Sequence, residues 1–275
     1  MKKVKITVAV ILAAITIFFV GCTAKKDKVP VIGISQYGEH ASLDNCREGF
    51  LLGLKEAGLT EGEDYTIDYQ NASFDNATAT QIANNFSSKN VALMCAIATS
   101  SATACYAAAE DKNIPVVFNA ITDPGEAGLT TGNITGVSDK LPVDPQLELI
   151  RKLQPDAKTI GIIYTTSEPN SVSAIAEYKE KAGNYGFTIE AIGVADQASV
   201  TQAADTLINK KVDCITNLTD NNVVGVLPSI LEKTNAAVFP YTVAKLSRLK
   251  KAVWRLPVSI MWSSAKWQVS LPLEF

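Results

Sequence analysis

The sequence predicts an α/β fold in which two doubly wound, Rossmann-like lobes follow one another along the chain. The 275 residues are 47% hydrophobic and 19% charged, which is typical of a globular protein and excludes disordered, collagen-like and disulfide-scaffold chains. Short apolar runs alternate with segments of helical periodicity, and the alternation starts again near residue 140. The length also suits about two domains.

The first lobe is predicted over residues 30–139. The apolar run PVIGIS at 30–35 is typical of a buried strand, and residues 43–57 place apolar side chains at helical spacing before Gly58, a C-terminal stop. The remaining predicted elements are strands at 65–70, 91–98, 115–120 and 134–137, and helices at 78–88 and about 101–110. Such alternation indicates parallel βαβ units with helices on both sheet faces.

The second lobe is predicted over residues 140–241. Its predicted helices lie at 142–153, 172–185, 200–209 and 223–234, and its strands at 159–164, 187–192, 212–217 and 236–240. Paired units of this kind bind small ligands in a cleft at the carboxyl ends of their strands.

Polar residues collect at those strand ends in both lobes. Thr99 opens a run of hydroxyls at the start of a predicted helix, where unpaired amides and the helix dipole favour a carboxylate. Hydroxyls at a helix start with carboxylates opposite suit a zwitterion. The candidate ligand-binding residues are Gln36, Thr99, Ser100, Ser101, Thr122, Asp123, Glu168, Asn170, Ser171 and Asp220.

Local roles compete with ligand binding at several of these positions. Ser100, Ser101 and Asp220 are also typical helix caps, and Asp123 before a proline is a common turn arrangement. His40, the one histidine of the chain, is predicted to be solvated or locally bonded.

The start of the chain is predicted to be a targeting segment, followed by a tether at 22–29. Three lysines precede an apolar run of 15 residues at 6–20, too short to cross a bilayer as a helix. The sequence FVGC then resembles a bacterial lipobox, which predicts cleavage after residue 21 and acylation of Cys22. An ordinary cleaved signal peptide is the alternative.

Charge and missing motifs exclude several function classes. The net charge is -3, but residues 22–241 carry 16 basic and 27 acidic side chains, a balance that repels nucleic acid. The chain has no GxGxxG, GxxxxGK[ST] or GxSxG motif and no metal-ligand spacing of Cys and His, so no cofactor or metal is expected. Buried, unpaired thiols are predicted for Cys46, Cys95, Cys105 and Cys214.

Several segments together resemble the ABC-transporter substrate-binding lipoproteins, specifically the subgroup associated with tryptophan and tyrosine uptake. They include IGISQYGEHASLD, REGFLLGLKEAGL, IATSSA, PVVFNAITDPGEAGL, NITGVSD, AKTIGIIY, EPNS and TDN. The resemblance covers about residues 31–240. It implies a type I periplasmic-binding-protein fold that closes on an amino acid. It further implies a protein that catalyses no reaction, is anchored on the outer face of the cell membrane, and delivers its ligand to permease and ATPase subunits. It also places the candidate residues at or beside the cleft, with the helix start at residue 99 taking the carboxylate and Asp220 the ammonium.

Residues 242–275 depart from this pattern. The alternation stops, glycine is absent, and all three tryptophans occur here. Within the degeneracy of the genetic code, re-reading the codons one base earlier allows a string that resembles the family's own continuation. We therefore expect an out-of-frame tail, so that the C-terminal part of the fold is missing; a basic amphipathic membrane or partner segment is the alternative.

Two other function classes stay open at this point. One is a doubly wound enzyme, for example a hydrolase using Glu39, His40 or Asp123. The other is a ligand-sensing receptor lobe that passes occupancy to a partner.

Overall fold

The computed structural model describes residues 28–237, 240–242, 260–261 and 268–269. The predicted targeting segment, Cys22 and most of the tether lie outside the described residues, as does most of the predicted out-of-frame tail. Two short strands of that tail are described, β10 (Ile260–Met261) and β11 (Gln268–Val269), which pair antiparallel.

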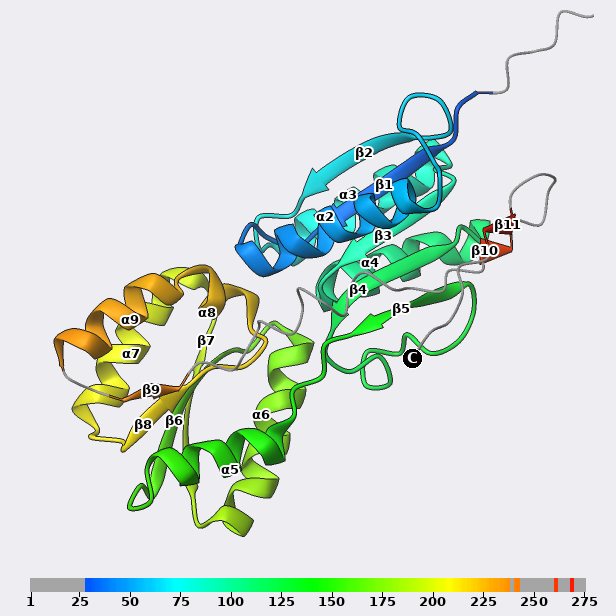
Figure 1. Ribbon diagram of the computed structural model, residues 1–275. Helices are drawn as coiled ribbons and strands as arrows, with labels where there is room; N and C mark the ends of the chain where they lie inside the picture. The colour runs from blue at the N-terminus through cyan, green and yellow to red at the C-terminus, as the bar shows by residue number, and fades with distance from the viewer. Residues whose placement is uncertain (1–27, 238–239, 243–259, 262–267, 270–275) are drawn as a thin grey trace, which may run out of the picture.

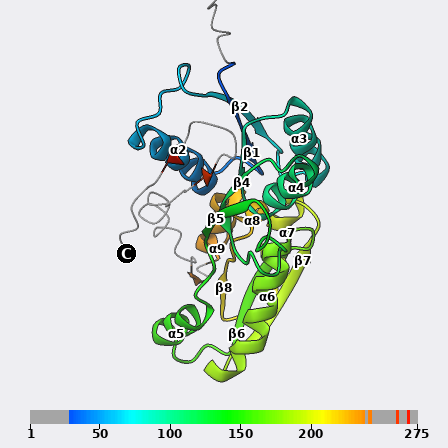
Figure 2. The same ribbon diagram turned by 90° about the vertical axis from the view of Figure 1, so that its right-hand side faces the viewer.

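The first lobe is a five-stranded parallel sheet in the order β2-β1-β3-β4-β5. Its helix α2 covers one face of the sheet, and α3 and α4 cover the other (Figures 1 and 2). The elements are β1 (Val31–Gln36), α2 (Ala41–Glu56), β2 (Thr66–Asn71), α3 (Asn76–Lys89), β3 (Leu93–Ile97), α4 (Thr99–Ala109), η1 (Glu110–Lys112), β4 (Val116–Ile121) and β5 (Ile134–Ser138).

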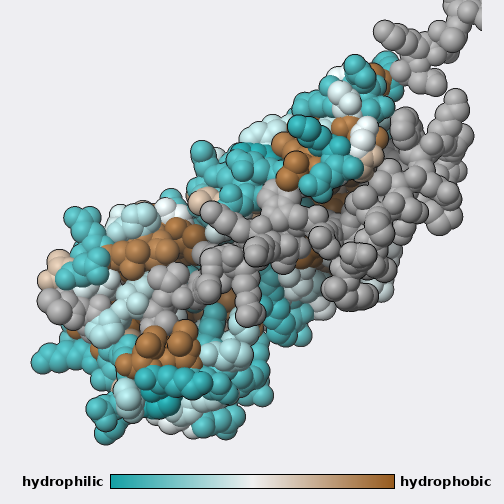
Figure 3. Space-filling model, in the orientation of Figure 1, coloured by the Kyte–Doolittle hydropathy of each residue, from teal (hydrophilic) through white to brown (hydrophobic). Residues whose placement is uncertain are grey.

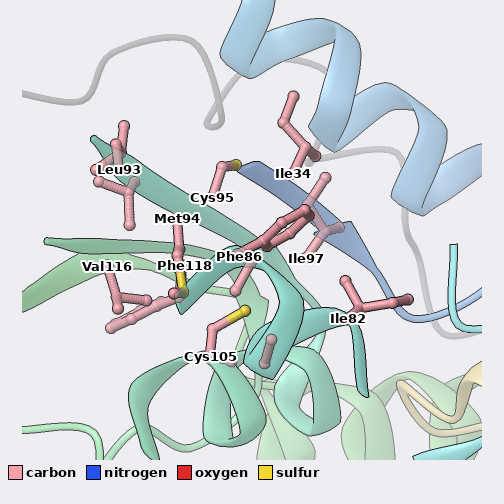
Figure 4. Close-up of a cluster of buried hydrophobic side chains, with 14 of the residues drawn as sticks. Ile34, Ile82, Phe86, Leu93, Met94, Cys95, Ile97, Cys105, Val116 and Phe118 are labelled. Atoms are coloured by element: carbon pink, nitrogen blue, oxygen red, sulfur yellow. The ribbon is translucent and has the colours of Figure 1, made fainter. Parts of the chain in front are cut away.

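The core of this lobe forms because its central strand has no polar face. All five residues of β3 are buried, so both faces of the sheet must be covered. Figure 4 shows Phe86 of α3 and Cys105 of α4 among the strand side chains of this core. A Cβ at Gly33 would lie 2.7 Å from the Phe86 ring, so glycine allows the helix to approach the sheet. Burying a ring of this size contributes about 2–3 kcal/mol.

The second lobe is a four-stranded parallel sheet in the order β7-β6-β8-β9. Its elements are α5 (Val143–Leu153), β6 (Thr159–Thr165), α6 (Pro169–Lys181), η2 (Ala182–Tyr185), β7 (Thr188–Val194), η3 (Gln197–Ser199), α7 (Val200–Asn209), β8 (Cys214–Thr216), α8 (Asn221–Gly225), α9 (Leu227–Ala236) and β9 (Tyr241–Thr242).

Side chains along β6 point alternately to the two faces of the sheet, which divides the core of the second lobe into two clusters. Ile160 and Ile162 pack with side chains of α5 and α6, whereas Ile163 packs with those of α7 and α9. Successive residues of a strand point to opposite faces, so helices must cover both sides of this sheet as well. The α/β fold with two parallel sheets predicted from the sequence is therefore confirmed.

Two predicted elements near residue 230 are wrong in detail. The single helix predicted at 223–234 is two helices, since Val226 has a non-helical backbone and Pro228 has no amide to continue the α8 ladder. The strand predicted at 236–240 starts later, because Ala236 still belongs to α9 and the pairing with β8 begins at the Pro240 carbonyl.

The cysteines of the two cores match the prediction. Cys46, Cys95, Cys105 and Cys214 are buried and unpaired. Among the described residues no group of three or more Cys, His, Asp or Glu side chains is arranged to hold a metal ion. No described helix has the length and hydropathy needed to cross a membrane.

The face of the molecule seen in Figure 3 is mainly hydrophilic, with separate hydrophobic patches on both lobes. Leu149 and Leu153 lie one turn apart on α5 and are 47% and 62% exposed. Isolated apolar side chains of this kind are normal on protein surfaces.

Candidate functional site

The carboxyl ends of both sheets face one another where the lobes meet (Figure 1). Among the described residues, hydrogen bonds between side chains or loops cross from one lobe to the other. The Thr122 and Thr219 hydroxyls lie 2.6 Å apart, His40 Nε2 lies 3.3 Å from Asn221 Oδ1, and the Asn76 amide donates to the Ser167 carbonyl at 3.2 Å. Polar groups that follow strand ends of the two lobes therefore meet at the boundary between them.

Glu168 is a fully buried residue at this boundary and directly precedes α6. Both of its oxygens accept hydrogen bonds from the backbone and side-chain amides of Asn221 and Asn222, at 2.7–3.0 Å, and Asn170 donates to it at 3.1 Å. Burial and the nearby charge of Asp220 raise the pKa of Glu168 to about 7 from an ordinary value of 4.5. The site thus holds a carboxyl group that titrates near neutral pH.

Asp220 is the second fully buried carboxylate of the second lobe. It caps α8 by accepting from the Val223 amide at 2.9 Å, and it accepts from the amide and hydroxyl of Thr165 at 2.5 and 2.8 Å. These bonds tie the end of β6 to the start of α8. Within the described residues neither Asp220 nor Glu168 has a lysine or arginine partner, so the second lobe presents two buried carboxyl groups without a matching cation.

The first lobe presents the start of α4 to the same boundary. Thr99, Ser100 and Ser101 are all buried, and the residue before them, Ala98, has φ 78°, a conformation that strains any residue with a Cβ. Ser35 donates to the Ser101 hydroxyl at 3.2 Å. The Thr99 hydroxyl is buried and bonds to no other group in the described part of the chain.

Tyr37 links this helix start to the carboxylates. Burial, followed by the charge of Glu168, raises the pKa of Tyr37 to about 12, and its hydroxyl also bonds to Ser100. The Tyr37 hydroxyl donates to the Phe74 carbonyl at 3.0 Å. Groups from the ends of β1 and β3 therefore lie within electrostatic range of Glu168.

Asn170 and Ser171 open α6, which packs against α4 across the boundary. The Asn170 Nδ2 donates to Glu168 and, at 2.8 Å, to the Thr219 carbonyl. Because both donors of the amide are used in this way, its Oδ1 is left as an acceptor, and this atom is buried with no partner among the described residues. Two facing helix starts thus each carry an unpaired polar atom.

The other predicted site residues have partners within the protein, and those of Gln36 and Asp123 are local. Gln36 is fully buried, donates to the Gly38 carbonyl and Asp44, and accepts from Arg47 at 2.9 Å. Asp123 accepts from the amides of the two residues after Pro124 and forms a 3.2 Å ion pair with Lys140, the turn role considered above. Thr122 contacts Thr219 and donates to Asp139, whose pKa burial raises to about 6.

Sequence reasoning missed several members of this boundary. Asn221 and Asn222 follow the same strand end as Asp220 but are not among the candidate ligand-binding residues. Phe74 has φ 64° and packs so closely on Gly38 that a Cβ there would lie 2.0 Å from its ring. No periodic pattern marks a phenylalanine in a turn. His40 is not solvated or locally bonded as expected, because its partner Asn221 lies 181 residues away.

The comparison with protein families decides which class of protein carries this arrangement. A family model described as ABC transporter substrate binding protein matches residues 31–251. The chain belongs to this family of extracytoplasmic substrate-binding proteins. The family is non-enzymatic, so the enzyme alternative is dropped.

Individual relatives agree with this assignment. The chain is 39% identical over 215 residues to a tyrosine-binding protein of Clostridioides difficile; the match covers 76% of this chain and 61% of the relative. The chain therefore spans about three fifths of the length of that relative.

Two solved structures differ in how well they superpose. The ABC domain of Streptococcus pneumonia in complex with L-Trp is 29% identical, covers 89% of this chain and 88% of its own, and has a TM-score of 0.77. The ligand-free, open structure of a substrate-binding protein with adhesive properties from Clostridium difficile is 35% identical, covers 82% and 83%, and has a TM-score of 0.56. This fold is thus more similar to the L-Trp complex than to the open structure.

Proposed function

We propose that this protein binds a free amino acid with an aromatic side chain between its two lobes and delivers it to an ABC importer. One observation carries the proposal: two buried carboxyl groups that have no cation partner among the described residues, Glu168 and Asp220, lie opposite a hydroxyl-rich helix start that favours an anion. An amino acid is the small solute that supplies the missing cation and the missing anion together.

Each end of the amino acid has a proposed partner. The carboxylate binds the first amides of α4 and the unpaired Thr99 hydroxyl. The ammonium binds the unpaired Oδ1 of Asn170, with Glu168 and Asp220 supplying the negative field. In this arrangement Asp220 acts on the ammonium through its charge, since its oxygens already hold Thr165 and α8.

The aromatic class of the ligand rests on the relatives. One is named for tyrosine, and another was solved with L-Trp. An aromatic cluster at the boundary consists of Tyr37, His40 and Phe74. The Tyr37 ring is edge-on to Phe74, and the His40 ring is stacked on Phe74, with ring centres 6.1 and 6.4 Å apart respectively. Such rings provide flat apolar surface for an aromatic side chain.

The place of action is proposed from the family and the start of the sequence. The partners are the permease and ATPase subunits of an importer, and acyl chains on Cys22 hold the protein on the outer face of the cell membrane. Replacement of Cys22 by serine should release the protein from the membrane fraction.

Residues 242–275 are proposed to be read out of frame. The support is the abrupt change in composition after Tyr241, with three tryptophans and no glycine in the segment. Sequencing the gene through this junction tests the proposal, which is wrong if the written frame is found and intact relatives end in the same way.

Isothermal titration calorimetry of the purified protein with the twenty common amino acids tests the ligand. We expect one-to-one binding of L-Trp or L-Tyr in the micromolar range or tighter, with the ligand recovered unchanged by mass spectrometry. Absence of heat and of a thermal shift with every amino acid would rule out the proposed function. A chemically altered ligand would restore the enzyme alternative.

A further inference from the structure

His40 and Phe74 form a stacked ring pair on the first lobe. Their planes are 7° apart, with the ring centres 6.4 Å from each other. His40 directly precedes α2, and the backbone of Phe74 is held at φ 64° in the turn after β2. A phenylalanine in this left-handed region is strained, and such strain is concentrated at ligand sites.

The hydrogen bond to the second lobe determines which nitrogen of His40 carries the proton. Asn221 Nδ2 donates to a Glu168 oxygen at 2.7 Å, and the same oxygen accepts from the Asn221 backbone amide. The Asn221 Oδ1 is therefore the atom that faces His40, at 3.3 Å from Nε2, and an oxygen there can only accept. His40 Nε2 must then carry the hydrogen.

The other nitrogen of the neutral ring is consequently an acceptor. Burial lowers the pKa of His40, against smaller opposing effects of Asn221 and of Asp44 on α2, so the neutral ring is favoured. His40 Nδ1 is buried and has no hydrogen-bond partner in the described part of the chain. A buried acceptor without a donor is unfavourable, and in a binding cleft it indicates a donor that arrives with the ligand.

We propose that His40 Nδ1 accepts a hydrogen bond from a donor on the aromatic ring of the ligand, a phenol O–H or an indole N–H. This inference rests on the proposed function and sharpens it. The ring pair supplies the flat surface, and the nitrogen selects amino acids whose ring carries a donor over those whose ring does not. A site that hydrogen-bonds one group of a substrate discriminates against the analogue that lacks it, because the protein atom is then left unpaired.

The same imidazole also connects ring recognition to lobe closure. His40 Nε2 reaches Asn221 only when the lobes are together, and Asn221 in turn holds Glu168. A ligand ring that fixes the imidazole therefore supports the contact that closes the second lobe over it.

Two substitutions separate the two nitrogens. In His40→Gln the terminal amide reaches the position of Nε2 and keeps a donor for Asn221, but no acceptor stands at the position of Nδ1. In His40→Asn the amide occupies the position of Nδ1 and keeps an acceptor, but it does not reach Asn221. Both variants remove the stacked imidazole, so each is the control for the other.

The test is calorimetry with two matched ligand pairs, L-Tyr against L-Phe and L-Trp against 3-benzothienyl-L-alanine, in which sulfur replaces the indole N–H. For the pair that contains the preferred ligand, we expect the native protein to favour the donor-bearing member by about tenfold, the value of one neutral hydrogen bond. His40→Gln should reduce this ratio to about twofold. His40→Asn should keep most of the ratio while weakening both ligands.

The outcomes distinguish the two proposals. Equal affinity for both members of the pair in the native protein, or an unchanged ratio in His40→Gln, overturns the role of Nδ1 while leaving amino-acid binding in place. Absence of binding by all four ligands to the native protein overturns the proposed function, and the role of Nδ1 with it.

Discussion

The two sides of the candidate cleft are built from different chemistry. The side from the first lobe presents mainly neutral groups, the aromatic cluster and the hydroxyls of Thr99 to Ser101 around the start of α4. The side from the second lobe carries Glu168 and Asp220, surrounded by carboxamide side chains. The lobes share the same βα architecture, so the fold alone does not produce this difference.

The difference teaches how a cleft distinguishes the two ends of a zwitterion. A helix start and hydroxyls stabilise an anion without introducing a buried positive charge. The backbone N–H groups at a helix start do not stabilise a cation. Carboxylate side chains must supply the negative charge instead, and they must be fixed in position by hydrogen bonds. In the proposed site, the carboxamides of Asn221 and Asn222 hold Glu168 in place.

The largest expected effect is a loss of stability, which tests whether Asp220 on the charged side joins β6 to α8. Asp220→Ala removes three hydrogen bonds to a buried carboxylate, including the α8 cap, and should lower the free energy of unfolding by about 3 kcal/mol. Asp75→Ala, which removes a solvent-exposed cap of α3, should cost only about 1 kcal/mol. Urea unfolding followed by circular dichroism measures both. Similar losses in the two variants would show that Asp220 does not hold β6 and α8 together.

The second expected effect is a pH dependence of ligand affinity that comes from the charged side. The pKa of Glu168 is raised from 4.5 to about 7, so between these two pH values Glu168 is protonated in the folded protein and ionised in the unfolded chain. The ammonium of the ligand favours the ionised carboxylate, so affinity should fall about tenfold for each pH unit below 7, with proton release on binding. The same shift stabilises the ligand-free protein below pH 4.5, and this contribution is lost as the pH rises through 7.

Calorimetry between pH 5.5 and 8 measures the pH dependence. Asp139→Asn is the control, since the pKa of Asp139 is also raised, to about 6. The slope should persist in that variant and vanish in Glu168→Gln. A flat profile in the native protein would exclude Glu168 from ligand recognition.

The smallest expected effect tests the neutral side. Thr99→Val removes the unpaired hydroxyl at nearly constant volume and should weaken amino-acid binding about fivefold, because one hydrogen bond to the ligand carboxylate is lost. Binding of the amine that lacks the carboxylate, tyramine or tryptamine, should not change. Thr206→Val on the exposed side of α7 is the matched control. Equal weakening of amino acid and amine would remove Thr99 from the carboxylate end.

Much of this arrangement could be predicted from the sequence because it follows from local rules. Apolar runs such as VALMCAIA and the hydroxyls after them locate a buried strand and a helix start, so β3 and the start of α4 follow from pattern alone. Polar residues after the strands likewise located Glu168 and Asn170. The prediction of a single helix at 223–234 overlooked Pro228, a residue that interrupts a helix because it has no backbone amide to donate.

The long-range contacts could not be predicted in the same way. The partner of His40 depends on how two lobes dock, and its sequence neighbours hold no information on Asn221. Similarly, Gln36 and Asp123 are polar residues at strand ends like the others, but local partners, Arg47 and Lys140, occupy their side chains. Strand-end position indicates which residues are near the cleft; only the fold shows which polar atoms stay unpaired.

The buried thiols of the two cores have a consequence for a protein that works outside the cell. Burial raises the pKa of Cys46 and Cys105 to about 12 and that of Cys214 to about 11, so these sulfurs stay protonated and unreactive towards oxidants while the chain is folded. Unfolding exposes all of them at once in an oxidising medium, where they form cross-links within and between chains. Where such cross-links form faster than refolding, the lifetime of a protein is set by its unfolding rate.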